Sequence, residues 1–222
     1  KPEKCLFNTQ RVEFLGYVIT PGSISMDQEK VTAILTWPVA TTKKGVQSFL
    51  GFCNFYRRFV RDFSRIVRPI TVLTKKDSKF YWTAEAQKAF EKMKQLFTTA
   101  PILALPTPDK PYYVEVDASE FAAGAVLSQR SGEKDLLHPV AFFSRTFSSA
   151  ERNYDVADKE LLAIKMALEE WRYLLEAARH SVTIYTDHRN LESLQKAKRL
   201  RPRQARWALF FSRFDLLITY IQ

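Results

Sequence analysis

Three acidic residues in the second half of the sequence could come together in one site. Asp117 and Asp187 each end a stretch whose alternating residues predict a β-strand, and Glu160 lies in the first turns of a helical pattern between them. Alternate residues of a strand share a face, so the branched apolar residues beside each Asp face away from it. If the two strands are parallel neighbours, both carboxylates emerge at one edge of the sheet, where ligand sites tend to form. Glu160, one residue before Leu161 on the buried helix face, could lean over that edge.

Such a cluster suggests metal chemistry. Carboxylates repel one another strongly at close range and persist together when a hard cation neutralises them, and Mg²⁺ prefers oxygen ligands. Two such ions, about 3.5–4 Å apart, are the usual arrangement for in-line displacement at phosphorus. An ordinary interpretation stays open on spacing alone, because Asp at a strand end is a common turn residue and Glu in a helix is usually solvated.

The elements that must position these acids form an ordered series after residue 111. Alternation predicts strands over residues 112–117, 124–129, 139–144, 181–187 and 216–221, and helical spacing predicts helices over residues 155–177, 189–194 and 202–214. The long helix carries its buried face at heptad-like spacing on Leu161, Ile164, Leu168, Trp171 and Leu175. This order implies a mixed sheet with a right-handed crossover through the long helix.

The first half has a different pattern. We expect a strand over residues 11–20, then a short helix that runs to residue 37 and is opened by a capping box at Ser25–Gln28. A second helical pattern starts near Thr42 and runs through Phe59, and Thr83 caps a third helix. Four prolines within residues 101–111 exclude a helix or a central strand, which places a domain boundary there.

Charge is distributed unevenly along the chain. The net charge is +10, and residues 1–110 carry 18 Lys and Arg against 9 Asp and Glu, whereas residues 111–222 are almost neutral. A basic first half favours a polyanion such as nucleic acid. No apolar run approaches the roughly 18 residues of a membrane span, so no membrane partner is expected. Cys5 and Cys53 form no metal-binding pattern and indicate inert thiols in a reducing, intracellular compartment.

Two basic strips are candidates for phosphate contacts. Arg58, Arg61, Arg65 and Arg68 are spaced three and four apart, so a continuous helix would place them on one face beside Arg57, unless residues 62–64 break it. The second strip comprises Lys196, Lys198, Arg199, Arg201, Arg203 and Arg206. A solvated charged face is the alternative for such patterns.

An ordered series of motifs resembles the ribonuclease H domain of gypsy-type long-terminal-repeat retrotransposons. The motifs are VDAS at 116–119, GAVLSQ at 124–129, PVAFFSR at 139–145, NY at 153–154, DKELLAI at 158–164, WRYL at 171–174 and YTDHRNL at 185–191. The first half resembles the end of the polymerase in the same polyproteins: FLGY at 14–17 is similar to a primer-grip hairpin, and VQSFLGFCNFYRR at 46–58 to a thumb.

The resemblance implies an α/β protein: an α+β thumb region followed by a ribonuclease H-like mixed five-stranded sheet with flanking helices. Residues 1–24 would end the reverse transcriptase palm, residues 25–106 would form a helical thumb, and residues 107–222 a ribonuclease H-like domain truncated at its C-terminus. The implied activity is endonucleolytic hydrolysis of the RNA strand of an RNA–DNA hybrid. Asp117, Glu160 and Asp187 would be its catalytic, metal-binding acids, with two Mg²⁺ ions for which Mn²⁺ substitutes.

The implied partners are the hybrid, a template–primer duplex, and the polymerase fingers and palm of the polyprotein. Ser119 joins both basic strips as an expected nucleic-acid contact. Expected locations are the cytoplasm, a virus-like particle or the nucleus. Two departures from the family pattern stand out: we expect the polymerase motif to lie upstream of residue 1, and the family's fourth acid has no counterpart after Asp187. The alternative function is therefore a non-catalytic nucleic-acid-binding or domesticated fragment.

Overall fold

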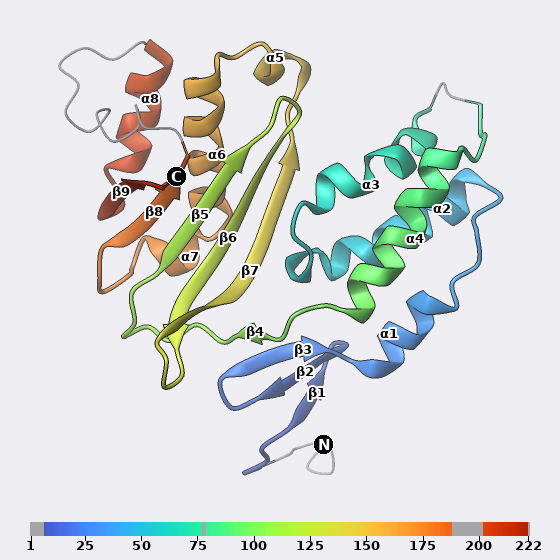
Figure 1. Ribbon diagram of the computed structural model, residues 1–222, viewed down its shortest axis with the longest axis horizontal. Coiled ribbons are helices and arrows are strands. Elements are labelled where there is room, and N and C mark those ends of the chain that lie inside the picture. Colours follow the sequence, from blue (N-terminus) through green and yellow to red (C-terminus); the bar gives the residue numbers. More distant parts are fainter. Residues whose placement is uncertain (1–6, 77–78, 188–201, 222) are drawn as a thin grey trace. The chain divides into compact units, whose positions relative to one another are not determined.

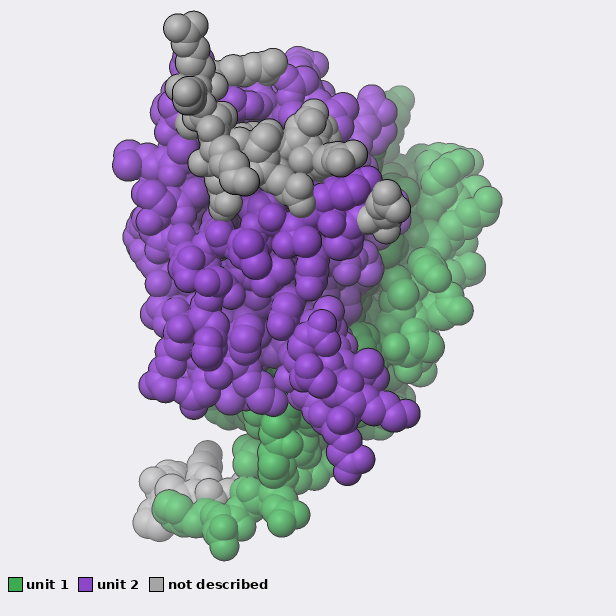
Figure 2. All heavy atoms as spheres, turned by 60° about the vertical axis from the view of Figure 1, so that its left-hand side comes forward, with its two compact units in different colours: residues 1–60, 66–105 green, residues 61–65, 106–222 purple. Residues whose placement is uncertain are grey.

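The computed structural model describes residues 7–76, 79–187 and 202–221. It divides into two compact units, one made of residues 1–60 and 66–105 and the other of residues 61–65 and 106–222 (Figure 2). The assignment of residues 1–24 to a palm, 25–106 to a thumb and 107–222 to a nuclease domain stays a prediction.

The first unit opens with a β-hairpin instead of the single strand predicted over residues 11–20. Strands β1 (Val12–Phe14) and β2 (Tyr17–Thr20) are antiparallel and are joined by Leu15 and Gly16, whose φ angles are 50° and 80°. Two positive φ angles are what a tight two-residue hairpin turn requires, and glycine adopts them without steric cost. Strands β3 (Ser23–Met26) and β4 (Leu103–Ala104) complete a four-stranded sheet in the order β1-β2-β3-β4 (Figure 1).

The capping box predicted at Ser25 is wrong, because Ser25 lies inside β3 and pairs with Val18. Helix α1 (Gln28–Leu35) starts two residues later, with Asp27 as its N-cap. The Asp27 carboxylate accepts a hydrogen bond of 2.8 Å from the backbone N–H of Glu29. Strand pairing therefore takes precedence at Ser25, and Asp27, the next residue with a side chain able to cap, serves as the N-cap.

Two further helices begin where the sequence predicted. Thr42 caps α2 (Lys43–Phe55) and Thr83 caps α4 (Ala84–Thr98). Their apolar faces form the core of the first unit, with Val46, Phe49, Phe90, Met93 and Phe97 all buried.

The helical pattern predicted to continue through Phe59 ends earlier. After α2 the chain forms a short 3-10 helix, η2 (Arg57–Phe59), an extended Val60, and Asp62 with φ of 57° before α3 (Phe63–Thr71) and the 3-10 turn η3 (Val72–Thr74). A residue with a left-handed backbone interrupts a right-handed helix. The arginines spaced three and four apart therefore do not lie on one continuous helix.

Gly16 provides a test of the hairpin. A Cβ at this position would lie 2.2 Å from the hydroxyl oxygen of Tyr56, whereas a Cβ at Gly22, which also has positive φ, would meet no atom within 4 Å. We expect Gly16→Ala to destabilise the protein by at least about 2 kcal/mol, because it adds a steric clash to the backbone cost of about 1 kcal/mol. Urea denaturation measures the loss. Gly22→Ala is the control and should show the backbone cost alone; equal losses for the two variants would contradict the hairpin contact.

The second unit contains the predicted mixed sheet. Its strands are β5 (Tyr113–Ala118), β6 (Ala122–Ser131), β7 (Leu136–Thr146), β8 (Val182–Thr186) and β9 (Leu216–Tyr220), in the order β7-β6-β5-β8-β9 (Figure 1). β5 pairs with β6 in antiparallel and with β8 in parallel, and β8 pairs with β9 in parallel. The α/β class and the mixed five-stranded sheet are confirmed.

Helix α6 (Val156–Glu170) covers one face of this sheet. It contacts β5 and β6, and the predicted buried residues Leu161, Ile164 and Leu168 are each at most 1% exposed. The helix predicted over 155–177 is divided at Trp171, after which α7 (Arg172–Leu175) follows. The unit also contains α5 (Ser149–Arg152) and α8 (Pro202–Phe211), which ends three residues before the predicted boundary. The helix predicted over 189–194 lies outside the described residues.

A buried glutamine fixes the segment that leads into this sheet. Gln129 of β6 is 2% exposed; its side-chain oxygen accepts from the backbone N–H of Thr107 at 2.8 Å, and its amide nitrogen donates to the carbonyls of Thr107 and Lys110. A buried amide is stable only when its hydrogen bonds are made. Gln129 thus holds the proline-rich segment against β6.

In the described ranges, no helix is both long and apolar enough to cross a membrane.

Candidate active site

Strands β5 and β8 bring two of the predicted acids to the same edge of the sheet. Their parallel register pairs Val114 with Ile184 and Glu115 with Tyr185. Continued by two residues, this register places Asp117 opposite Asp187. Val114 and Ile184 are fully buried, so the acids, three residues further along each strand, lie on the other face. The condition on which the sequence analysis rested, that the two strands are parallel neighbours, is therefore met.

The third acid, Glu160, reaches this edge from α6. Its side chain is 3% exposed, and its Oε1 accepts a hydrogen bond of 3.1 Å from the backbone N–H of Ala118, the residue after Asp117. The other oxygen, Oε2, is buried and makes no hydrogen bond within the described part of the chain. A buried carboxylate oxygen without a donor is costly, so it marks a place where a cation or a proton is needed.

The electrostatics of the edge show that the three carboxylates act on one another. Burial, followed by the charges of Asp187 and Asp117, raises the pKa of Glu160 to about 8, against the opposing hydrogen bond from Ala118. The pKa of Asp117 is also raised, first by partial burial and then by the charges of Asp187 and Asp62. Without a counter-ion, this edge therefore disfavours full ionisation.

The carboxylates do not form a closed metal cage as they stand. Across residues 7–76, 79–187 and 202–221, no group of three or more His, Cys, Asp or Glu side chains is arranged to hold one metal ion. The structure thus shows an electrostatically coupled acidic edge.

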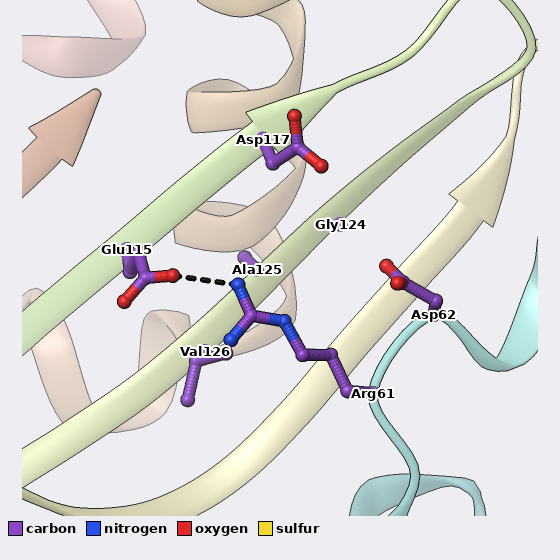
Figure 3. A pocket seen from close by; sticks show the side chains of 7 residues that line it. All are labelled: Arg61, Asp62, Glu115, Asp117, Gly124, Ala125 and Val126. Carbon is purple, nitrogen blue, oxygen red and sulfur yellow. Dashed lines mark hydrogen bonds and ion pairs between the residues drawn. The ribbon is translucent and has the colours of Figure 1, made fainter. Parts of the chain in front are cut away.

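A segment from far earlier in the chain also lines the edge. Residues 61–65 belong to the second unit, and Figure 3 shows Arg61 and Asp62 facing the same pocket as Glu115 and Asp117. The Arg61 guanidinium donates to Glu115 at 2.6 Å, and Arg65 pairs with Asp62 at 2.9 Å. Both arginines counter the pKa increase of Asp117. The guanidinium groups of Arg61 and Arg65 therefore lie beside the acids.

Two hydrogen bonds between Ser64 and Ser144 of β7 fix this segment. The backbone N–H of Ser64 donates to the hydroxyl of Ser144 at 2.7 Å, and the Ser64 hydroxyl donates to the carbonyl of Ser144 at 2.8 Å. Gly124, which pairs with Ser144, leaves room for the carboxylate of Asp62, since a Cβ there would lie 3.2 Å from its Oδ1. A side chain at residue 124 would fit tightly against Asp62 and would require a shift of a few tenths of an ångström.

The remaining predicted contact residues have varied surroundings. Arg57, Arg58 and Arg68 belong to the first unit. Ser119 closes the β5–β6 turn: its hydroxyl donates to the carbonyl of Ala122 and accepts from the N–H of the same residue, both at 3.0 Å. Arg203 is held by Asp158 at 2.9 Å, and Arg206 is exposed on α8. Lys196, Lys198, Arg199 and Arg201 lie outside the described residues.

Sequence reasoning missed Asp62 as a neighbour of the acidic edge. It identified residues 62–64 only as a possible helix break, and no local pattern connects residue 62 with residue 117. The one signal was chemical: Asp62 is the only acid between Glu29 and residue 77, and it lies between Arg61 and Arg65.

Comparison with known proteins agrees with this fold. Residues 82–184 match the family described as "RNase H-like domain found in reverse transcriptase". This part of the chain is thus similar to the RNase H-like domains of reverse transcriptases.

Over nearly its whole length the chain is also related to retrotransposon polyproteins. The Tf2-3 and Tf2-4 transposon polyproteins of Schizosaccharomyces pombe (strain 972 / ATCC 24843) are 38% identical to it over 223 residues, which is 98% of this chain. The chain spans only 16% of the length of those relatives.

Solved structures show the same fold. A foamy viral protease–reverse transcriptase in complex with double-stranded DNA has a TM-score of 0.79 at 25% identity, covering 96% of this chain and 45% of that chain. The same enzyme in complex with an RNA/DNA hybrid has a TM-score of 0.79 at 24% identity, covering 99% and 30%.

Proposed function

We propose that this chain is part of a gypsy-type retrotransposon polyprotein and that its second unit hydrolyses the RNA strand of an RNA–DNA hybrid. One observation carries the proposal: on an RNase H-like sheet, Glu160 is buried with one oxygen that has no partner among the described residues, and burial together with the charges of Asp187 and Asp117 raises its pKa. An acidic edge that is unstable when fully ionised suits a site completed by divalent cations.

The chemistry of the donors at this edge, though not yet their spacing, suits Mg²⁺ as the cofactor. Mg²⁺ takes oxygen ligands, and the edge offers carboxylates from Asp117, Glu160 and Asp187, including one buried oxygen that has no donor among the residues the structure describes. The same donors also suit Mn²⁺. Bound divalent ions would relieve the repulsion that the three charges create and would thereby stabilise their ionised forms.

The chain's own residues have distinct roles in this proposal. Asp117, Glu160 and Asp187 would hold the ions, which supply activation of a water molecule and stabilisation of the leaving oxygen. In the hydrolysis, the water oxygen bonds to phosphorus and the bond from phosphorus to the 3′ oxygen breaks, which leaves a 3′-hydroxyl and a 5′-phosphate. Arg61 and Arg65 would exchange their carboxylate partners for backbone phosphates of the hybrid.

The first unit would serve as the end of the palm and the thumb and bind template–primer through its basic surface. Its excess of Lys and Arg supports this role, and so does the full-length likeness to a foamy viral enzyme in complex with double-stranded DNA. Its further partners would be the polymerase fingers and palm of the polyprotein.

A cleavage assay tests the activity directly. Residues 1–222 are incubated with a hybrid labelled on its RNA strand, with and without Mg²⁺, beside single-stranded RNA and duplex RNA of the same sequence. We expect Mg²⁺-dependent internal cleavage of the hybrid alone, with products ending in 3′-hydroxyl groups. Binding of the hybrid without cleavage in Mg²⁺ or Mn²⁺ would refute the nuclease proposal.

The second candidate function is non-catalytic binding of nucleic acid. It is favoured by one observation, that the described residues form no group arranged to hold a metal ion. The same assay separates the two candidates, since this alternative predicts hybrid affinity that does not depend on Mg²⁺ and no RNA cleavage.

Salt dependence tests the role of the arginines. With on the order of five phosphate contacts, the logarithm of the association constant should fall against the logarithm of salt concentration with a slope of roughly −3 to −5. Arg61→Gln with Arg65→Gln should make the slope shallower by about 1.8, since each lost contact removes about 0.9. Fluorescence anisotropy of a labelled hybrid measures it.

The control double variant is Arg11→Gln with Arg179→Gln. Both arginines are exposed and ion-paired, with Glu13 and Asp109 respectively. This control removes the same charge and should leave the slope unchanged. Equal slopes for the two double variants would mean that Arg61 and Arg65 act only through the net charge of the protein.

A further inference from the structure

Helix α8 is held at both ends by acid–arginine contacts. At its N-terminal end, Asp158 of α6 binds Arg203 and Gln204, and at its C-terminal end Arg213 binds Glu176, the residue that follows α7. The two contacts differ in burial: the Asp158 side chain is 3% exposed, whereas the Glu176 side chain is 32% exposed. They also differ in position, because only Asp158 belongs to the helix turns that carry Glu160.

The Asp158 contact is a complete buried network. Oδ2 accepts from the guanidinium of Arg203 at 2.9 Å, and Oδ1 accepts from the side-chain amide of Gln204 at 2.9 Å. The Arg203 guanidinium lies 3.6 Å from the ring centroid of Tyr154, just before α6. Asp155 caps the same helix by accepting from the backbone N–H of Asp158 at 2.8 Å. A buried carboxylate with both oxygens satisfied holds its helix firmly, because breaking one partner leaves a buried charge.

Glu160, by contrast, has little of its own to hold it. It makes one hydrogen bond, to the N–H of Ala118, and its second oxygen has no donor in the described chain. The place of its carboxylate is therefore set by the position and rotation of the first turns of α6. Asp158 lies two residues away in the same turns and points to α8, while Glu160 points to the sheet.

We propose that Asp158 is a positioning residue, which fixes the first turns of α6 through Arg203 and Gln204 and so places the Glu160 carboxylate at the acidic edge. This inference rests on the proposed nuclease function. Sites of this kind need their groups within about 0.5 Å of the productive place, which residues behind the reacting groups provide. It also gives Arg203 a role different from the phosphate contact that the basic strip suggested, since its guanidinium is engaged by Asp158 and Tyr154.

The test compares Asp158→Asn with Glu176→Gln. Each replaces a carboxylate by its amide at one end of α8, so both weaken the hold on that helix, but only the first acts on the turns that carry Glu160. Four quantities are measured well below the unfolding temperature: kcat and KM for hybrid cleavage, the Mg²⁺ concentration for half-maximal rate, Mn²⁺ affinity by calorimetry, and hydrogen exchange of the Ala118 amide. The Ser119 amide, which donates to the carbonyl of Ala122, is the internal control.

For Asp158→Asn we expect kcat to fall and the Mg²⁺ midpoint to rise, each by on the order of 10- to 100-fold, with KM changed by less than about threefold. Mn²⁺ affinity should fall in step. The Ala118 amide should exchange about tenfold faster, in keeping with the loss of a hydrogen bond of about 1.4 kcal/mol, while Ser119 keeps its rate. Glu176→Gln should change none of these. If Asp158→Asn does not fold, Gln204→Ala removes one arm only and should give the same pattern more weakly.

Equal behaviour of Asp158→Asn and Glu176→Gln in all four measurements would overturn the proposal and leave Asp158 a purely structural residue. Loss of Ala118 protection together with unchanged kcat and unchanged metal affinity would also overturn it. A third outcome separates this proposal from the nuclease function. If no form of the protein cleaves hybrid, yet only Asp158→Asn speeds exchange of the Ala118 amide and weakens Mn²⁺ binding, the positioning role of Asp158 is supported and the nuclease function is refuted.

Discussion

Replacing Asp117 by Asn is expected to reduce hybrid cleavage by at least about 100-fold without unfolding the protein. A bound divalent ion contributes several kcal/mol to stabilising the transition state of such reactions, and each 1.36 kcal/mol is a factor of ten in rate. The amide keeps the shape of the carboxylate but removes the charge that would hold the ion. Activity is measured with saturating hybrid at several Mg²⁺ concentrations.

The same variant should be at least as stable as the parent in the absence of metal. Partial burial and the charges of Asp187 and Asp62 raise the pKa of Asp117, which means that its ionised form is disfavoured in the folded protein. A neutral side chain relieves that repulsion, so loss of activity should accompany unchanged or increased stability.

Asp109→Asn is the control for Asp117→Asn, because it makes the same chemical change at an exposed carboxylate that is paired with Arg179. It should leave cleavage unchanged. Parent-like turnover in Asp117→Asn would remove Asp117 from the site and with it the proposed metal binding at this edge.

Glu160 should make the stability of the metal-free protein depend on pH. Its pKa is raised in the folded protein to about 8 from an ordinary value of 4.5. A raised pKa means that the folded state binds the proton more tightly than the unfolded state does. The stabilisation is therefore fully present below about pH 4.5 and is lost as the pH rises to about 8.

Glu160→Gln should remove this dependence and stabilise the metal-free protein above pH 8 by a few kcal/mol. For a chain of this size, each kcal/mol shifts Tm by about 2–4 °C. Thermal unfolding in EDTA from pH 5 to pH 9 measures the effect. Mg²⁺ should raise Tm of the parent most at high pH, where Glu160 is ionised, and should raise Tm of Glu160→Gln much less. Identical pH profiles for the two proteins would show that Glu160 is not strained by its surroundings.

The parts of the fold that the sequence predicted are those where one face of an element is buried. Alternation along β5 and β8 and the heptad-like spacing of α6 reflect burial directly, so both strands and the buried face of the helix were predictable, whereas the parallel pairing of the strands entered only as a condition. The parallel register of β5 and β8 then places Asp117 and Asp187 at the same edge of the sheet. The predictions at Ser25 and over residues 11–20 failed because strand pairing and a two-residue turn override local capping signals.

The contacts of the candidate site depend on residues far apart in sequence, which no local pattern reports. Asp62 lies at the acidic edge because Ser64 binds Ser144, and Gly124 leaves space for its carboxylate. In the sequence, Arg203 resembles the other members of a basic strip. In the structure, α8 packs against α6 and the Arg203 guanidinium donates to the Asp158 carboxylate. Charge alone therefore does not distinguish a phosphate-binding arginine from one that neutralises a buried carboxylate.

The hydrogen bonds of Gln129 determine where an independently expressed second unit can start. A fragment that begins at Pro111 would retain the whole of β5 but would lose Thr107 and Lys110, which supply all three partners of the buried Gln129 amide. Each unsatisfied buried group costs about 1–3 kcal/mol, a large share of the stability of a small domain. A fragment that begins at Pro106 keeps every hydrogen-bond partner of Gln129. A five-residue difference in the start point therefore decides whether the buried amide in β6 makes its hydrogen bonds.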